Sequence, residues 1–152
     1  MQMIDEAGFW RNDRLVFMVI LLVSLPAMLI HLGNPPFIED EGIRSLVALE
    51  MDLSGNYIAP TLNGEYYFKK PPLWNWILLL TFKMTGQVHE FTARIPTLFF
   101  LYIFCITIFV VYRKWIGARQ AMLNGVVFLT SGRILFWDSM LALIDICFSW
   151  IM

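Results

Sequence analysis

The stretch Leu15–Leu32, LVFMVILLVSLPAMLIHL, decides the fold class. It holds eighteen residues without a formal charge. At 1.5 Å per residue, a helix of that length reaches about 27 Å and nearly crosses a hydrocarbon core of roughly 30 Å. A cleaved signal peptide is the alternative, but its apolar core would be about 7–15 residues long, and no small-x-small cleavage pattern follows here. The stretch therefore predicts an uncleaved membrane-spanning helix.

The composition of the whole chain also indicates a membrane protein. Of its 152 residues, 59% are hydrophobic and 15% are charged, against roughly 45–50% and about 25% in typical soluble domains. A net charge of −1 provides no basic field for a nucleic-acid partner. Cys105 and Cys147 lie in apolar runs without a CxxC or Cys/His cluster, so neither a disulfide framework nor a zinc site is predicted.

Basic residues set the expected orientation. Arg11 and Arg14 precede the first span, and basic residues beside a span tend to stay in the cytoplasm, so the N-terminus is predicted to lie inside. Residues 33–92 then form an outer loop rich in turn signals and acids. Within the loop, Gly42–Leu53 predicts an amphipathic helix on the bilayer surface. Its apolar positions are Ile43, Leu46, Val47 and Leu53.

The apolar segment Pro72–Phe82 is too short to cross and suits an interfacial helix. The next run, Ile95–Tyr112, is long enough to cross and is followed by Arg113, Lys114 and Arg119. If Pro72–Phe82 also crossed, this basic loop would lie outside, against the positive-inside tendency. We therefore expect Pro72–Phe82 to lie flat.

Two further apolar segments complete the prediction. Gln120 to about Trp137 forms a third span, with Asp138 where the chain re-emerges. From Ser139 onward, fourteen residues give about 21 Å of helix, too short to finish a crossing, so the chain reads as cut off mid-helix. The expected fold is an all-α membrane protein with three transmembrane helices (about 15–32, 94–112 and 120–137), a truncated fourth (139–152) and juxtamembrane amphipathic helices in the first outer loop.

Three consecutive acids, Glu39-Asp40-Glu41, lie where the outer loop meets the predicted surface helix. Crowded carboxylates at a low-dielectric boundary hold a proton more readily, which suits a general base. The alternative is structural: Asp40 caps the helix, Glu41 meets the positive end of its dipole, and Arg44 pairs with either acid. The spacing leaves both interpretations open.

Lys69-Lys70-Pro71-Pro72 ends the polar part of the same loop and follows the aromatic run Tyr66-Tyr67-Phe68. Two ammonium groups beside aromatic rings at headgroup level suit a lipid-linked phosphate, with the rings stacking on a sugar. Tyrosines and lysines at membrane interfaces also commonly anchor and snorkel without binding a substrate. The presence of acidic and basic clusters in one loop favours a binding or catalytic role.

The order of motifs along residues 34–145 resembles a known family. The motifs are Ile38-Glu39-Asp40-Glu41-Gly42-Ile43-Arg44, Ala48-Leu49-Glu50-Met51, Ser54-Gly55-Asn56-Tyr57, Pro60-Thr61-Leu62-Asn63-Gly64, Tyr67-Phe68-Lys69-Lys70-Pro71-Pro72-Leu73 and Thr92-Ala93-Arg94-Ile95-Pro96. Together they resemble the N-terminal region of GT-C-type glycosyltransferases that use polyprenyl-phosphate sugars. This group includes the lipid A aminoarabinose transferases and the protein O-mannosyltransferases.

The resemblance implies an inverting sugar transfer from a polyprenyl-phosphate donor to a lipid or protein acceptor, at the periplasmic face of a bacterial inner membrane. On that resemblance Asp40 activates or orients the acceptor, and Lys70 contacts the donor phosphate. Arg44 helps to neutralise the leaving phosphate. The remaining expected substrate-binding residues are Glu41, Tyr67 and Asp138. Asp40 and Lys70, thirty residues apart, are expected to meet at one lipid headgroup.

The chain departs from the family in two ways. Lys69 stands where the aminoarabinose transferases have a metal-contacting glutamate, which argues against a bound metal, and no cofactor is expected. Family members are several times longer, so we expect a fragment that is inactive alone. The alternative is a non-catalytic small membrane subunit that binds a lipid phosphate or partner helices. A transporter is disfavoured because Leu15–Leu32 and Ile95–Tyr112 carry no formal charge.

Overall fold

The computed structural model describes residues 6–30, 32–38 and 40–152, so Glu39 of the acidic triplet lies outside the described residues. Helices form most of the fold: α1 Glu6–Leu29, α2 Asp40–Ser54, α3 Leu73–Thr85, α4 Glu90–Ile116, α5 Ala118–Leu129, α6 Gly132–Phe136, the 3-10 helix η1 Asp138–Met140 and α7 Asp145–Ile151. The strands β1 Thr61–Leu62 and β2 Glu65–Tyr66 form one antiparallel pair. The fold is therefore mainly helical, as predicted, with a small hairpin that the all-α prediction did not include.

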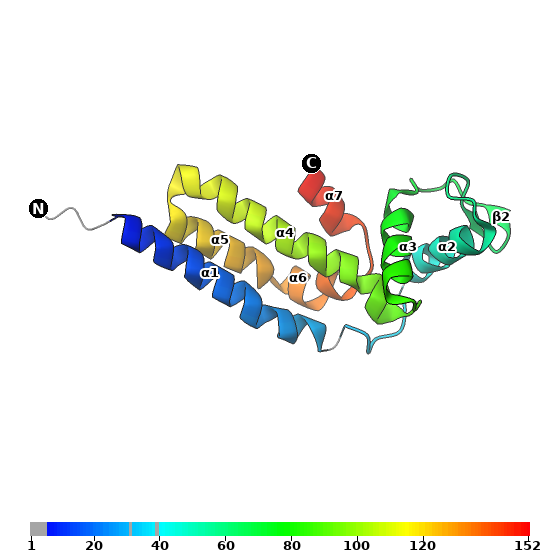
Figure 1. Ribbon diagram of the computed structural model, residues 1–152, viewed down its shortest axis with the longest axis horizontal. Coiled ribbons are helices and arrows are strands. Elements are labelled where there is room, and N and C mark those ends of the chain that lie inside the picture. Colours follow the sequence, from blue (N-terminus) through cyan, green and yellow to red (C-terminus); the bar gives the residue numbers. More distant parts are fainter. Residues whose placement is uncertain (1–5, 31, 39) are drawn as a thin grey trace, which may run out of the picture.

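Two helices in the described part of the chain are long and apolar enough to cross a membrane. They are Asn12–Leu29, within α1, and Glu90–Ile116, which is α4. Both were expected from the hydrophobic runs. Figure 1 shows α1, α4 and α5 alongside one another, with α2 and the hairpin at the end of the molecule far from the start of α1.

The predicted third span, Gln120 to Trp137, is not one continuous helix. α5 ends at Leu129, and the chain continues through α6 and η1. The break falls at Thr130–Ser131, where the Thr130 hydroxyl donates to the carbonyl of Val126 and Ser131 adopts an extended conformation. Ser and Thr side chains compete with the helix for backbone hydrogen bonds, and the following Gly132 adds conformational freedom. The apolar run therefore bends back into short pieces beside α4.

The helices of the outer loop differ in orientation. Figure 1 shows α3 running across the long axes of α1 and α4, as expected for a segment lying flat, while α2 extends beyond α3. The predicted α2 helix is confirmed. Of its predicted apolar positions, Val47 is buried, whereas Ile43, Leu46 and Leu53 are exposed, because α2 packs against α3 through the neighbouring face. The buried residues of that face are Glu41, Arg44, Ser45, Val47, Ala48 and Met51.

A close helix contact fixes α5 against α1 and α4. The Phe17 ring of α1 stacks on Phe109 of α4, with centroids 4.6 Å apart. A Cβ atom added at Gly125 of α5 would lie 3.0 Å from the Phe17 ring and 3.5 Å from the carbonyl oxygen of Cys105. The absence of a side chain at Gly125 therefore allows the close approach of these three helices.

The hairpin of the outer loop is held to α2 by one carboxylate. Glu50 accepts hydrogen bonds from the Thr61 hydroxyl at 2.6 Å and from the backbone N–H groups of Asn63 at 2.6 Å and Gly64 at 3.3 Å. Asn63 and Gly64 have φ angles of 54° and 82°, the left-handed conformations that a tight hairpin turn needs. The Thr61 hydroxyl bond, followed by the two backbone bonds, lowers the pKa of Glu50.

Substituting Gly125 tests the packing of the three helices. Gly125→Ala should lower the thermal unfolding temperature and reduce the free energy of unfolding by about 1–3 kcal/mol. The reason is that the Phe17 ring is buried between its neighbours and has little room to move. Gly132→Ala is the matched control, since no atom lies within 4 Å of its added Cβ. Equal unfolding temperatures for the two variants in detergent would contradict the packing argument.

The pH dependence of the hairpin tests the Glu50 anchor. In the folded protein the pKa of Glu50 lies below its ordinary value. The ionised carboxylate therefore stabilises the hairpin fully above the unfolded pKa, and this stabilisation is lost as the pH falls through the folded pKa. Hydrogen-exchange protection of the Asn63 and Gly64 amides should therefore fall on acidification. Glu50→Gln should weaken this protection at neutral pH, and the protection should then no longer fall on acidification, because the carboxylate is gone. Glu65→Gln should keep the fall on acidification.

Candidate functional site

Asp40 and Lys70 form an ion pair at the base of the outer loop. Asp40 is the first residue of α2, and Lys70 lies just before Pro71 and Pro72, at the approach to α3. Their side chains are 43% and 36% exposed, respectively, so both charged groups are accessible to a ligand. The two residues are brought together as expected, because the hairpin returns the chain from the end of α2 to its beginning.

Glu41, the next residue, is fully buried and points to the interior. Its carboxylate oxygens lie 2.5 Å from Nη2 and 3.2 Å from Nε of Arg94, whose side chain is also fully buried. The same carboxylate accepts the backbone N–H groups of Ile38 and Ala142, each at 2.8 Å. Glu41 therefore does not reach the accessible surface around Asp40, and the substrate contact expected for Glu41 is not supported.

Arg94 uses the rest of its guanidinium to hold the loop between α1 and α2. It donates to the carbonyl oxygens of Leu32, Pro35 and Pro36 at 2.7, 2.9 and 3.1 Å. A planar guanidinium with several donors suits a bidentate carboxylate and extra carbonyl acceptors. Arg94, expected from the sequence only as part of the Thr92–Pro96 motif, therefore orients the start of α2, from which Asp40 emerges.

Arg44 pairs with neither Asp40 nor Glu41, contrary to the structural alternative considered above. It lies on the buried face of α2 and is 5% exposed. Burial lowers the pKa of Arg44, and the nearby Tyr67 and Asp145 oppose this effect. Its Nη1 atom is buried and has no hydrogen-bond partner among the described residues. A buried cationic donor without a partner is costly, so Arg44 is available to an anionic ligand.

The aromatic run divides between the core and the surface. Tyr67 is buried with Val47 and Met51, so its ring is not free to stack on a sugar as expected. Tyr66 and Phe68 are each 70% exposed and stack on one another with centroids 5.7 Å apart. Alternation along an extended chain explains the division, since successive side chains point to opposite faces.

Asp138 lies in η1, apart from the Asp40–Lys70 pair. Its carboxylate accepts a hydrogen bond from Nε of Arg133 at 2.9 Å, and its side chain is 7% exposed. Arg133 itself is 75% exposed. The structure therefore places Asp138 in an ion pair with a neighbouring cation and not in direct contact with the other candidate residues.

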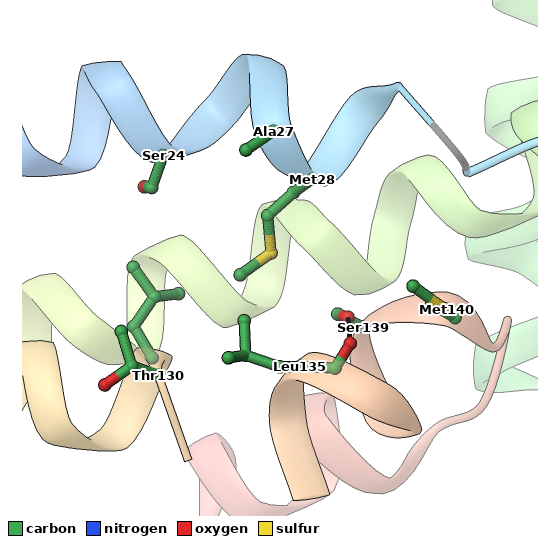
Figure 2. A pocket seen from close by; sticks show the side chains of 8 residues that line it. Ser24, Ala27, Met28, Thr130, Leu135, Ser139 and Met140 are labelled. Carbon is green, nitrogen blue, oxygen red and sulfur yellow. Dashed lines mark hydrogen bonds between the residues drawn. The ribbon is translucent and has the colours of Figure 1, made fainter. Parts of the chain in front are cut away.

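A separate cavity of about 160 Å³ lies between α1 and the broken segment after α5 (Figure 2). Two of its polar groups are already bonded: Ser24 lies 2.8 Å from the Tyr102 hydroxyl, and Ser139 donates to the carbonyl of Leu135. The remaining lining is mainly apolar, with Ala27, Met28 and Leu129 among its side chains. This cavity offers little to orient a polar ligand and is set apart from the candidate site.

Among the described residues, no group of three or more His, Cys, Asp or Glu side chains gathers in a way that could hold a metal ion. The exposed Lys69 occupies the position before Lys70.

Comparisons with known proteins show what the chain is similar to. No protein-family profile matches the chain. An undecaprenyl phosphate-alpha-4-amino-4-deoxy-L-arabinose arabinosyl transferase of Shewanella sediminis is 31% identical over 111 residues, which are 73% of this chain and 19% of that protein. The enzyme of the same name from Pseudomonas savastanoi pv. phaseolicola is 29% identical over 116 residues, 75% of this chain and 22% of that protein.

Solved structures with a similar fold come from the same group of enzymes. The apo crystal structure of ArnT from Cupriavidus metallidurans superposes with a TM-score of 0.78 at 22% identity, covering 97% of this chain and 26% of that chain. The structure bound to undecaprenyl phosphate has a TM-score of 0.81 at 23% identity, covering 89% of this chain and 25% of that chain. The chain has the fold of part of ArnT. The expected resemblance to the lipid A aminoarabinose transferases is thus confirmed, and the chain spans about a fifth of its curated relatives.

Removing one partner of the buried pair tests the role of Arg94 and Glu41. Glu41→Gln should lower stability by about 3–5 kcal/mol, because it leaves the Arg94 charge buried without its counter-charge. The double variant Glu41→Leu/Arg94→Leu should recover part of this loss, since neither charge then remains buried. Unfolding in detergent measures the effect, with exposed Glu65→Gln as control. A Glu41→Gln protein as stable as the control would contradict the assignment.

Proposed function

We propose that this chain is part of a membrane glycosyltransferase that moves a sugar from a polyprenyl-phosphate donor to a lipid or protein acceptor. The observation that carries the proposal is the Asp40–Lys70 pair, which joins a carboxylate and an ammonium group from two separate motifs in one accessible place. The named relatives transfer a sugar from undecaprenyl phosphate, and the ArnT structure with bound undecaprenyl phosphate supports the same class of donor.

Lys70 and Arg44 supply positive charge for the donor phosphate. Cleavage of the sugar C1–O bond leaves growing negative charge on that phosphate, so fixed cations beside it stabilise the transition state more than the ground state. The exposed Lys70 ammonium is the first contact, and the unpartnered Nη1 of Arg44 is a buried donor for the same anion. Burial strengthens such a contact because the local dielectric is low.

Asp40 supplies the carboxylate for the acceptor. When a phosphate engages Lys70, the Asp40 carboxylate loses part of its hold on the ammonium group and becomes free to accept a proton from the acceptor or to orient it. Attack from the face opposite the leaving phosphate inverts the configuration at C1. In this scheme, the bound donor separates the pair, so that Lys70 holds the phosphate and Asp40 faces the acceptor, and Glu41 with Arg94 keeps α2 in position.

The loop that carries the site is proposed to face the periplasm of a bacterial inner membrane. The basic residues near the N-terminus and after α4, including Arg14, Arg113 and Lys114, favour the cytoplasmic side for those ends. α1 and α4 then carry the chain to and from the opposite side, where α2, α3 and the hairpin lie together in Figure 1.

Neutralising either member of the pair tests the proposal in the full-length protein. Asp40→Asn and Lys70→Ala should each lower sugar transfer from a lipid-linked donor by at least about tenfold, or roughly 1.4 kcal/mol of barrier. Lys70→Ala should also weaken binding of undecaprenyl phosphate, whereas Asp40→Asn should act mainly on turnover. The assay follows radiolabelled sugar from the donor into membrane lipid and protein fractions.

Glu65→Gln provides the control for a changed surface charge, because Glu65 is exposed on the hairpin. Wild-type turnover by both Asp40→Asn and Lys70→Ala, at normal expression, would remove the catalytic assignment. Binding of undecaprenyl phosphate without transfer of any sugar by the wild type would favour a non-catalytic lipid-phosphate-binding subunit instead.

A further inference from the structure

Trp74 lies at the start of α3 and is fully buried. Its indole Nε1 donates a hydrogen bond of 2.9 Å to the backbone carbonyl of Ala142, which is also fully buried. Figure 1 shows the segment between η1 and α7, which contains Ala142, passing beside α3. A buried indole N–H needs an acceptor. This bond therefore holds the start of α3 to a segment 68 residues further along the chain.

Ala142 also contacts the start of α2. Its N–H donates to the Glu41 carboxylate at 2.8 Å, and the same carboxylate is paired with Arg94. Ala142 is thus bonded to α2 through its N–H and to α3 through its carbonyl. The two hydrogen bonds that join Glu41, Ala142 and Trp74 are called the buried bridge below.

The buried bridge lies close in sequence to both members of the accessible ion pair. Glu41 follows Asp40 directly, and Trp74 follows Lys70 after Pro71-Pro72-Leu73. A proline ring fixes its own φ angle near roughly −65° and also restricts the residue before it. The connection between Lys70 and Trp74 is therefore stiff. The bridge thus limits how far the backbone of Lys70 can move from that of Asp40.

The other contacts of α3 with the loop are weaker constraints on its start. The N-cap Pro72 has no side-chain cap hydrogen bond. Trp76 and Lys83 bond to Tyr57, and Lys83 also pairs with Asp52, in the exposed part of the loop. Exposed bonds compete with water and contribute less than buried ones. The buried bridge therefore keeps the two backbones in place when a bound donor opens the accessible ion pair.

We propose that Trp74 is a positioning residue for sugar transfer: through Ala142, its indole N–H holds Lys70 in a fixed place relative to the Asp40 carboxylate. The inference rests on the proposed function. The side chains of Asp40 and Lys70 separate around the donor while the buried bridge holds their backbones, so the reacting groups stay aligned. A misplacement of about 1 Å can lower a rate by roughly a hundredfold, so a modest loosening has a measurable effect.

Trp74→Phe in the full-length protein tests the inference, because it removes the N–H donor and keeps an aromatic ring. With an undecaprenyl-phosphate sugar donor, kcat per folded protein should fall about tenfold, while KM should change by less than about twofold. KM is preserved because the long Lys70 side chain can still follow the phosphate. Hydrogen exchange of the Ala142 amide and of the first turn of α2 should become faster, and melting temperatures verify folding.

Trp76→Phe is the matched control. The Trp76 indole also donates to a backbone carbonyl, that of Tyr57 at 2.7 Å, but in the exposed part of the loop. Its loss should leave kcat within about twofold of the wild type and should not change exchange at Ala142.

A double variant separates positioning from a general loss of stability. If Trp74 acts through Lys70, Trp74→Phe should lower kcat by less than about twofold in the Lys70→Ala background, because no ammonium group then remains to be positioned. Additive losses of kcat in Trp74→Phe/Lys70→Ala would overturn the inference, and so would wild-type kcat in a folded Trp74→Phe protein.

If Trp74→Phe does not fold, the benzothiophene analogue of tryptophan at position 74 keeps the ring shape and replaces the N–H group with sulfur. It should give the same loss of kcat. A wild type that transfers no sugar would contradict the proposed function itself. The exchange comparison of Trp74→Phe with Trp76→Phe does not depend on transfer, and unchanged exchange at Ala142 would show that Trp74 does not hold the two helices.

Discussion

The buried ion pair between Glu41 and Arg94 is the constraint on which the outer loop depends. Both side chains are fully buried, and such a pair is tolerable only when further hydrogen bonds satisfy its remaining atoms. Backbone N–H groups of Ile38 and Ala142 serve the carboxylate, and three carbonyl oxygens of residues 32–36 serve the guanidinium. One polar junction thereby ties together the end of α1, the start of α2, the start of α4 and the segment before α7.

This junction gives two neighbouring acids different environments. Consecutive residues on a helix are about 100° apart, so when Glu41 turns inward to Arg94, Asp40 is directed elsewhere and meets Lys70 at the surface. The buried acid is held rigidly, whereas the accessible acid can exchange its partner. A rigid start to α2 limits the positions of the Asp40 carboxylate, which is the condition for orienting a reacting group.

The break after α5 brings charged side chains together near the C-terminal end of the chain. A continuous helix over 120–137 would have buried its residues between apolar faces. The interruption at Thr130–Ser131 instead lets the chain fold back as α6, η1 and α7, so that Arg133 and Asp138 pair beside α4 and line a cavity together with Asp145. Charged side chains beside a long apolar helix are tolerable only where they face one another or a polar space.

The sequence by itself determined the mainly helical class, the two long apolar helices, the short helix α3 and the loop motifs, because these follow from local hydrophobicity, length and charge along the chain. Most of the division of roles among the polar residues was decided by tertiary structure. From the sequence, Arg44 was expected to pair with a neighbouring acid or with the donor phosphate, and Glu41 to contact the substrate. Arg94 was only part of a motif, and its place just before the apolar run Ile95–Tyr112 was the one signal of a structural role. Their burial depends on which faces of α2, α3 and α4 meet, and that choice is made by contacts between residues about 50 to 100 positions apart.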